Sequence, residues 1–310
     1  MLIKLSPGWG VPESEVTPEA AYFNRRQILK AAGLLALPAP FGAASEGAGP
    51  YPAVRNPEFT LERPLTAEAS ATSFNNYYEF HPTSKTAVKD LVSKFTTHPW
   101  TVEVKGLVNR PQRLELDHLL KTMPFEERLY RFRCVETWAM AVPWTGFPLA
   151  ELIKRVEPKP KAAYLRFVTA NRPRQMPGMK MAPSYPWPYQ EGLRLDEAMN
   201  PLTLLATGIY GKPLPKQSGA PIRLIVPWKY GYKSIKSIVT IEFVARQPKT
   251  FWNRVAPNEY GFYSNVNPSK PHPRWSQAYE RLIPTMERRP TLLYNGYAKW
   301  VAEMYTGKEH

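Results

Sequence analysis

The segment RFRCVETWAM, residues 131–140, contains Cys134, the only cysteine in the 310 residues of the chain. Arg131 and Arg133 precede this cysteine and Glu136 follows it. A cysteine that acts only as a small apolar side chain is expected in an apolar run, and this segment is not one. Neighbouring positive charge favours the thiolate, the form that binds metals and attacks electrophiles. We therefore expect a chemical role for Cys134, with an intermolecular link or a bystander as the alternatives.

The pattern around this cysteine predicts a strand that leads to it. Residues 127–136 alternate apolar and polar side chains, so Glu136 is expected on the same face of the strand as Cys134. Helical spacing predicts helices over 114–124 and 148–158, a helical turn over 193–199, and short helical stretches with loops from about residue 275. Further strands are predicted over residues 101–108, 162–170, 220–228 and 234–246.

The composition and the order of these elements predict an α+β fold with mixed β-sheets. Hydrophobic residues make up 43% of the chain, which is enough for a substantial core, while 34 prolines disfavour a helix bundle. The elements do not follow a regular β-α-β rhythm. No linker divides residues 70–310, and residues 45 to about 70 read as an extended arm, so we predict one domain over 45–310.

The first 44 residues resemble a twin-arginine export signal. The segment NRRQILK, residues 24–30, carries the arginine pair Arg25 and Arg26 ahead of a short apolar stretch, residues 31–44. That stretch is too short for a good membrane span. We expect export of the folded chain to the periplasm, with removal of residues 1–44. Since no other segment has the length of a membrane helix, the mature chain is expected to be soluble and monomeric.

The formal net charge of +15 allows an anionic partner but does not identify one. The basic residues are not clustered in long runs, and no nucleic-acid-binding module is recognisable, so we predict no nucleic-acid partner. Motifs for dinucleotides, P-loop phosphates, HExxH zinc sites and CxxC thiols are absent from the sequence. Residues 216–237 combine five basic residues with glycines at expected turns, which predicts a local anion site.

Several long motifs together resemble one enzyme family. They are YRFRCVETWAMAVPWTGFPL (130–149), SFNNYYEF (73–80), QMPG (175–178), the text of residues 185–215, GAPIRLIVPWKYGYKSIKSI (219–238) and RRPTLLYNGY (288–297). These segments are similar to the catalytic subunits of periplasmic methionine sulfoxide reductases, the MsrP family. The resemblance covers nearly the whole chain and implies the sulfite oxidase-type, molybdopterin-binding fold of molybdenum enzymes.

The resemblance implies a set of site residues. Cys134 is then the protein ligand of molybdenum, and Glu136 is a catalytic candidate that manages protons near the metal. The other two sulfur ligands come from molybdopterin in its mononucleotide form, without an attached nucleotide, one per chain. Ser218 stands where relatives often have asparagine, which makes its contact the least secure. The implied pterin contacts are Asn75, Tyr78, Glu79, Thr169, Ser218, Arg223, Ser234, Ile235 and Lys236.

The resemblance also implies a reaction and partners. The reaction is oxygen-atom transfer from protein-bound methionine sulfoxide to reduced molybdenum, which repairs oxidised periplasmic proteins. Electrons are expected from the quinone pool through a haem-binding membrane subunit, MsrQ, because the chain has no haem or iron–sulfur motif. Weaker candidates for the substrate mouth are Tyr260, Tyr263, His272 and Arg274.

Three alternatives stay open at this point. The first keeps the molybdopterin but reduces small S- or N-oxides. The second is a cofactor-free periplasmic module that binds anions through residues 216–237. The third is a thiol enzyme with Cys134 as nucleophile, although no histidine base is convincingly placed in the sequence.

Overall fold

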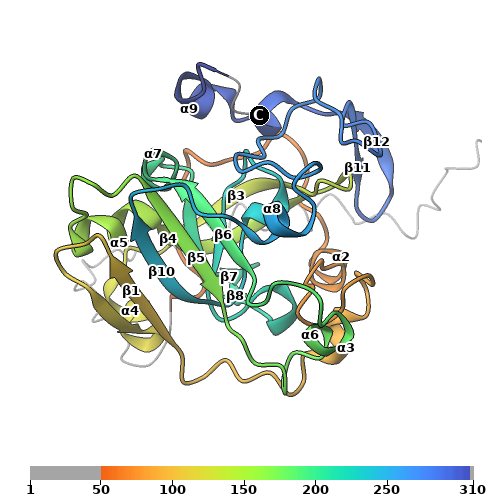
Figure 1. The fold of residues 1–310 in the computed structure, drawn as a ribbon. Helices are drawn as coiled ribbons and strands as arrows, with labels where there is room; N and C mark the ends of the chain where they lie inside the picture. The colour runs from red at the N-terminus through yellow and green to blue at the C-terminus, as the bar shows by residue number, and fades with distance from the viewer. Residues whose placement is uncertain (1–49, 308–310) are drawn as a thin grey trace, which may run out of the picture. The chain divides into compact units, whose positions relative to one another are not determined.

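The computed structural model describes residues 50–307, and Figure 1 shows their arrangement. The predicted export signal over residues 1–44 and the start of the predicted domain at residue 45 lie outside the described residues. Residues 50–67 form neither a helix nor an extended strand, in line with the expected arm. No helix of the described part is both long enough and apolar enough to span a bilayer.

A five-stranded sheet forms one side of the fold. Its order is β2-β1-β10-β5-β6, with β1 and β10 parallel and the other neighbours antiparallel. Buried and less buried residues alternate along β5, as expected for a strand with one face on the core. Figure 1 shows β10, β5 and β6 side by side. The strands are β1 (Thr101–Gly106), β2 (Gln112–Glu115), β5 (Tyr164–Thr169), β6 (Gln190–Arg194) and β10 (Ile238–Val244).

A seven-stranded sheet carries the segment around the cysteine. Its main order is β12-β11-β4-β7-β8, with β3 also paired to β4 and β9 to β7. The pair of β11 and β4 is parallel and the other pairs are antiparallel, so both sheets are mixed. The strands are β3 (Glu126–Arg133), β4 (Trp138–Pro148), β7 (Leu204–Ile209), β8 (Lys212–Pro213), β9 (Arg223–Ile225), β11 (Tyr279–Leu282) and β12 (Glu287–Pro290).

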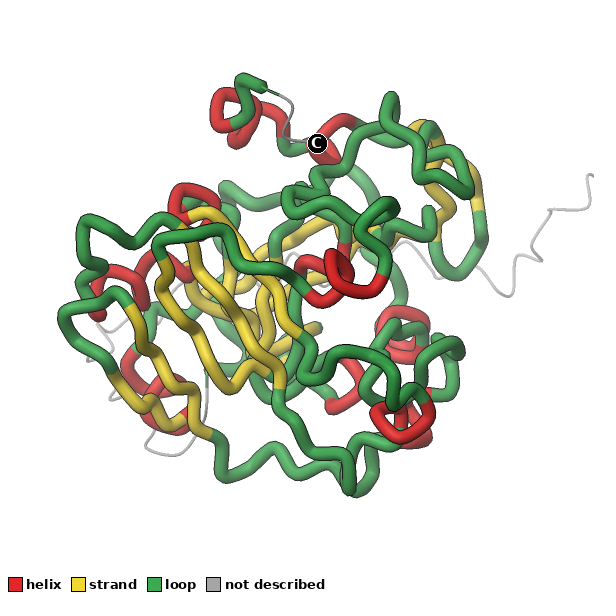
Figure 2. Tube along the Cα trace, in the orientation of Figure 1, coloured by secondary structure: helices red, strands yellow, loops and turns green. Residues whose placement is uncertain are grey.

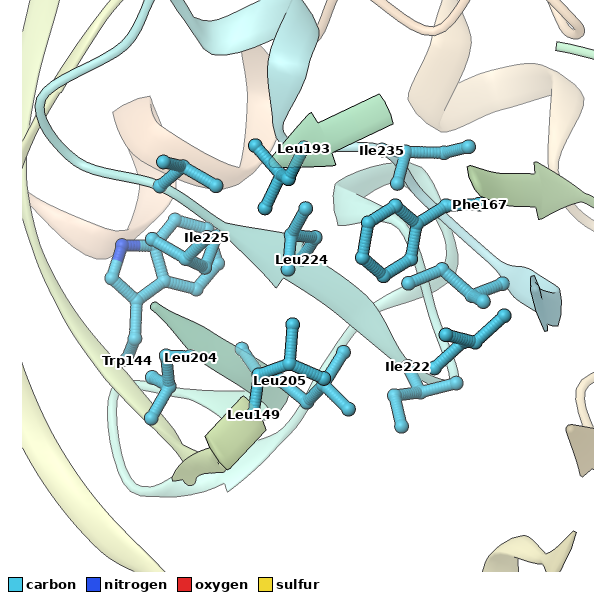
Figure 3. Packing of buried hydrophobic residues seen from close by; sticks show 14 of the residues in the cluster. Trp144, Leu149, Phe167, Leu193, Leu204, Leu205, Ile222, Leu224, Ile225 and Ile235 are labelled. Carbon is cyan, nitrogen blue, oxygen red and sulfur yellow. The ribbon is translucent and has the colours of Figure 1, made fainter. Parts of the chain in front are cut away.

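The two sheets share one hydrophobic core. Phe167 and Leu193 come from the five-stranded sheet, and Leu205 and Leu224 from the seven-stranded sheet, and all four are fully buried. Figure 3 shows these side chains in one cluster. Because apolar side chains from both sheets exclude water together, the arrangement holds the sheets against each other and fixes the loops at their ends.

The helices are short, as a proline-rich chain predicts, and loops join most elements (Figure 2). In α5, buried side chains recur at Leu149, Leu152, Ile153 and Val156, the spacing of one helical face. The α-helices are α2 (Glu68–Ser73), α3 (Val88–Leu91), α4 (Leu116–Thr122), α5 (Leu149–Val156), α6 (Gly178–Met181), α7 (Leu195–Met199), α8 (Phe251–Val255) and α9 (Ala298–Val301). The 3-10 helices are η3 (Lys216–Ser218), η4 (Gly231–Lys233), η5 (Leu293–Gly296) and η6 (Ala302–Met304).

Most predicted elements are confirmed, and four differ. The strand predicted over 127–136 ends early, at Arg133. The helix predicted from residue 114 begins at Leu116, because residues 112–115 pair with β1. The strand predicted over 220–228 is reduced to the three residues of β9. The segment after residue 275 contains the β11–β12 hairpin as well as short helices, because β11 pairs with β4 across a long sequence separation. Local patterns do not report such pairing.

Candidate active site

Cys134 lies in the tight turn that joins β3 to β4. The last strand pair is Arg133 with Ala139, and the Cys134 N–H then donates to the Trp138 carbonyl at 2.9 Å. The Thr137 N–H donates to the Cys134 carbonyl at 3.1 Å, and Thr137 has a φ of 76°. The prediction of a strand through residue 136 is therefore wrong. The strand ends at Arg133 because the left-handed backbone at Thr137 reverses the chain.

The turn brings hydrogen-bond donors to the sulfur. The Glu136 N–H lies 3.4 Å from Cys134 Sγ, and the amide Nδ2 of Asn76 lies 3.5 Å from it. Glu136 Oε2 is 4.0 Å from the same sulfur. Glu136 is thus close to Cys134, as predicted, but through the turn and not through a shared strand face. Asn76 was missed, although it lies beside the predicted Asn75 in the same motif.

The arginines do not act on the sulfur as the sequence suggested. The Arg133 guanidinium donates to the Cys134 carbonyl and to Gln277 Oε1, the latter at 2.8 Å, and that of Arg131 donates to the Asn295 carbonyl at 3.4 Å. Burial, reinforced by the Glu136 carboxylate, raises the pKa of Cys134 to about 12, more than the hydrogen bond from Glu136 N–H and the charge of Arg133 lower it. Burial in this structure therefore favours the neutral thiol, and a metal cation that coordinates the sulfur would favour the thiolate instead.

The Glu136 carboxylate is held by three donors. Oε2 accepts from Lys85 Nζ at 2.9 Å, Asn76 Nδ2 at 3.2 Å and Trp138 Nε1 at 3.3 Å. Lys85 was not predicted, because it comes from a loop far from Glu136 in sequence. These contacts fix the carboxylate beside Cys134 Sγ.

Two side chains from the C-terminal part of the chain fasten the same turn from the other side. The Val135 carbonyl accepts from Trp275 Nε1 at 2.9 Å and from Gln277 Nε2 at 2.7 Å. His272 stacks on Trp275 with ring centroids 3.7 Å apart. The turn that carries Cys134 is thus held through its backbone by residues about 140 positions later.

A cavity with an empty volume of about 930 Å³ adjoins Cys134. Aromatic side chains form much of its wall: Phe74, Tyr77, Tyr78, Phe132, Trp138, Trp144, Tyr189, Tyr232, Trp252 and Tyr260. Its polar lining consists of Asn75, Asn76, Glu79, Cys134, Glu136, Ser218, Arg223 and Lys236.

The structure brings most of the predicted cofactor contacts together. Asn75, Tyr78, Glu79, Ser218, Arg223, Ile235 and Lys236 line this cavity. Thr169 and Ser234 do not line it. They lie behind its wall, where Thr169 Oγ1 donates to the Lys236 carbonyl at 2.8 Å and Ser234 Oγ accepts from the Val226 N–H at 3.1 Å.

The polar groups of the cavity include unpaired atoms suited to an anion. Arg223 donates to the carbonyls of Ser218 at 2.7 Å and Ser234 at 3.0 Å, while its Nε and the Ser218 hydroxyl lack a partner among the described residues. Burial lowers the pKa of Arg223 to about 9. Burial also lowers the pKa of Lys236 and raises that of Glu79, whose charges interact. Buried cations and unpaired donors match an anionic phosphate, so these residues fit a molybdopterin.

The basic segment 216–237 is only partly the anion site that the sequence predicted. Lys229 Nζ forms a buried ion pair with Glu197 at 2.5 Å, and Lys233 Nζ forms one with Glu191 at 2.7 Å. These two lysines therefore form ion pairs in the protein interior and do not line the cavity. Their acidic partners are far away in sequence, so the charge pattern of the segment alone was misleading.

Gly219 allows Lys236 to take its place in the wall. Its φ of 103° belongs to the region that favours glycine, and a Cβ there would lie 2.8 Å from Lys236 Cγ. Ser218 and Lys236, which both line the cavity, are thus brought close by the absence of one side chain.

The four weaker candidates for the substrate mouth lie in different places. Tyr260 lines the cavity and also an outer groove, and Arg274 lines the groove only. His272 lies in a separate cavity beside Tyr230 and Gln277. Tyr263 lines none of these cavities and contacts Arg194 and Lys229 instead.

Comparison with known proteins identifies the family to which this chain is similar. The family model for the oxidoreductase molybdopterin binding domain matches residues 89–252. The protein-methionine-sulfoxide reductase catalytic subunit MsrP of Burkholderia mallei is 52% identical over 97% of this chain and 95% of the relative. The subunits of the same name from Ralstonia nicotianae and Xanthomonas axonopodis pv. citri are 51% and 50% identical, over 98% and 96% of their own lengths and 100% and 96% of this chain.

The chain belongs to the MsrP family. As an MsrP-family member it is an oxidoreductase with a molybdenum–pterin cofactor, and the predicted α+β, molybdopterin-binding fold of the sulfite oxidase type is confirmed. A cofactor-free anion-binding module is not favoured. The hydrogen-bond partners of Cys134 Sγ within the described residues are Asn76 and Glu136, so a histidine base for a thiol enzyme is not found there.

Proposed function

We propose that this protein reduces methionine sulfoxide in oxidised proteins, with Cys134 as the protein ligand of molybdenum. One observation carries the proposal. Cys134 lies in the wall of a cavity that is also lined by the buried Arg223 and the half-buried Lys236, in a chain about half identical, along nearly its full length, to protein-methionine-sulfoxide reductase catalytic subunits. A soft sulfur donor and a cationic region in one cavity match the two ends of a metal–pterin phosphate.

The cavity residues divide the work of holding the cofactor. Cys134 supplies a thiolate, and the N–H of Glu136 and Nδ2 of Asn76 point at that sulfur. Arg223 and Lys236 bind the phosphate, and Ser218 donates its unpaired hydroxyl. Thr169 and Ser234 orient these groups from behind the wall. We assign molybdopterin in the mononucleotide form, without an attached nucleotide, one per chain.

The reaction needs an oxygen acceptor, two electrons and two protons, and it yields a thioether and water. When bound, the molybdenum–pterin group supplies the two-electron oxygen-atom transfer. Glu136 presents a carboxylate whose Oε2 lies 4.0 Å from Cys134 Sγ, in the orientation that Lys85, Asn76 and Trp138 give it, and we assign it the transfer of protons at this site. The aromatic wall excludes water and offers an apolar surface to the thioether product.

The compartment and the electron donor follow from other features. The arginine pair Arg25 and Arg26 and the short apolar stretch after it support export of the folded protein to the periplasm by the twin-arginine route. The relatives are named catalytic subunits, which supports a second subunit. We assign that role to a haem-binding membrane protein of the MsrQ type, and we assign oxidised periplasmic proteins as the substrates.

The experiment compares metal content and substrate range. The wild type and Cys134→Ala are purified from a host that makes the cofactor, and molybdenum is measured with the circular dichroism spectrum as a control for folding. The expected result is one molybdenum per wild-type chain, none in the variant, and faster reduction of an oxidised protein than of dimethyl sulfoxide. Equal molybdenum in both proteins would overturn the ligand assignment. A preference for dimethyl sulfoxide or an N-oxide would instead support the small-molecule alternative.

A further inference from the structure

An open groove leads to the cavity beside Cys134. Its empty volume is about 1560 Å³, and residues 82–85, 136–138, 252–260 and 274–286 contribute to its walls. Six side chains line both spaces, so the groove is continuous with the cavity: Phe74, Tyr78, Glu136, Trp138, Trp252 and Tyr260. The groove is open to solvent and extends outward from the cofactor cavity, so a segment of a protein substrate can enter it from outside.

The charged side chains of the groove leave one cation in excess. The groove is lined by the cations Lys85, Arg274 and Arg281 and the carboxylates Glu136 and Glu259. Lys85 pairs with Glu136 at 2.9 Å, and Arg274 pairs with Glu259 at 2.7 Å. Within residues 50–307, Arg281 forms no ion pair with a carboxylate.

Arg281 is nevertheless held in a defined place. It lies on β11 opposite Trp138 of β4, and its N–H donates to the Thr137 carbonyl at 2.9 Å. Its guanidinium donates to Thr137 Oγ1, from Nε at 3.1 Å and from the terminal nitrogen at 2.8 Å. The side chain is exposed, so its remaining donors are available to a ligand in the groove. The cation is thus attached to the turn that carries Cys134.

We propose that the groove binds an extended segment of the oxidised protein, and that Arg281 binds a carboxylate close in sequence to the methionine sulfoxide. The inference rests on the proposed function. The aromatic side chains of the groove suit the methylene groups of the substrate side chain and apolar neighbours, and the excess cation selects an acidic neighbour. Because Arg281 is exposed, the pairing is weak and sensitive to salt.

The test uses sets of three peptides, one set for each tested position, and the three peptides of a set differ only at that position. Each carries one methionine sulfoxide in a neutral sequence, with Glu, Gln or Lys placed in turn at each of the two positions on either side. For each peptide, kcat/KM for reduction of the methionine sulfoxide is measured with the wild type, Arg281→Gln and Arg281→Lys. Arg288→Gln is the matched control, because Arg288 lies opposite Arg281 in the same hairpin but does not line the groove.

The wild type is expected to favour the Glu peptide over the Lys peptide by about three- to fivefold in kcat/KM at low salt, mainly through KM. Arg281→Gln is expected to lose this preference, and Arg281→Lys and Arg288→Gln to keep most of it. Raising the salt should remove it in the wild type. Molybdenum content serves as the check that Arg281→Gln has kept its cofactor.

Three outcomes would overturn the inference. They are equal rates for the three peptides in the wild type, loss of the preference in Arg288→Gln as well, and an equal loss for all peptides in Arg281→Gln, which would assign Arg281 a purely structural role. In each of these cases the Gln peptide is still reduced, so the proposed function stands. If no peptide is reduced by molybdenum-loaded wild type, the proposed function and this inference fail together.

Discussion

The ammonium group of Lys85 lies 2.9 Å from the carboxylate of Glu136, two residues after the cysteine that we assign to molybdenum. The lysine stands on a loop before the first sheet strand, while the glutamate stands in the β3–β4 turn. This pair therefore ties the N-terminal part of the described chain to the turn of the site. Both side chains are about 29% exposed, so they remain open to the outer groove.

Lys85→Met is expected to lower kcat about tenfold with little change in KM, because Glu136 loses the donor that orients it. The measurement is steady-state reduction of an oxidised protein by molybdenum-loaded enzyme. Lys89→Met is the control, since Lys89 forms a similar pair with Asp90 at 2.7 Å but in an exposed place away from the groove. An unchanged kcat in Lys85→Met would contradict the role of the pair.

Substitution of two lysines of the same basic segment, the buried Lys229 and the half-buried Lys236, is expected to have different consequences. Lys229→Met leaves Glu197 buried without its cation and should lower the free energy of unfolding by about 3–5 kcal/mol. Lys236→Met should leave stability nearly unchanged and lower the bound molybdopterin instead, because Lys236 lines the cavity. Urea unfolding and cofactor content measured on both variants check this. Comparable cofactor loss without destabilisation in Lys229→Met would refute the assignment.

The buried carboxyl group of Glu79 is expected to contribute to the pH dependence of the free energy of unfolding. Burial raises its pKa from 4.5 to about 7, so between these values the folded chain binds a proton that the unfolded chain has lost. Stability of the cofactor-free protein therefore falls as the pH rises through this range, by on the order of 3 kcal/mol from this group. Lys236, whose pKa burial lowers, has the opposite effect at higher pH, because there the unfolded chain binds the additional proton.

Glu79→Gln is expected to remove the Glu79 contribution. The change in the free energy of unfolding between about pH 5 and about pH 7 is measured for both cofactor-free proteins, so that other carboxyl groups cancel in the difference. A wild type that gains stability relative to Glu79→Gln over this range would show that the carboxyl is stabilised as an anion.

Gly219→Ala is expected to affect the cofactor as well as the fold. The left-handed backbone there costs about 1–3 kcal/mol with a side chain, and the new methyl group would displace Lys236. Gly211→Ala is the matched control, because Gly211 has a φ of 69° but its Cβ would meet Pro52 at 3.3 Å, away from the cavity. Both variants should melt earlier, and only Gly219→Ala should lose molybdopterin. Full cofactor content in Gly219→Ala would contradict this.

The sequence predicted the elements better than the directions of the side chains. Strands such as β1 and β5 and the helix α5 depend on local periodicity, which a sequence displays. The directions of Arg131 and Arg133 depend on Asn295 and Gln277, which are more than 140 residues away in the chain. No local pattern contains that information. The charge of Arg133 does lower the pKa of Cys134, as expected, but burial and the Glu136 carboxylate outweigh it.

The residues of the site were also predicted only in part. Most of the predicted contacts line one cavity because long motifs of the family recur in the chain. Lys85 was missed because its partner Glu136 is 51 positions later and nothing in its own loop marks it. The lysines of 216–237 misled for the same reason, since burial beside Glu197 and Glu191 is a property of the tertiary structure.

The hydrogen bonds from Trp275 and Gln277 to the Val135 carbonyl join two segments of the chain that are synthesised at different times. The loop with the lone thiol is translated well before the two side chains that anchor it. A ribosome-bound intermediate that stops before residue 275 lacks both anchors, so the turn that carries Cys134 is not yet fastened from that side while synthesis continues. We therefore expect a C-terminal truncation before residue 275 to impair cofactor loading, even though every residue that lines the cavity is still encoded.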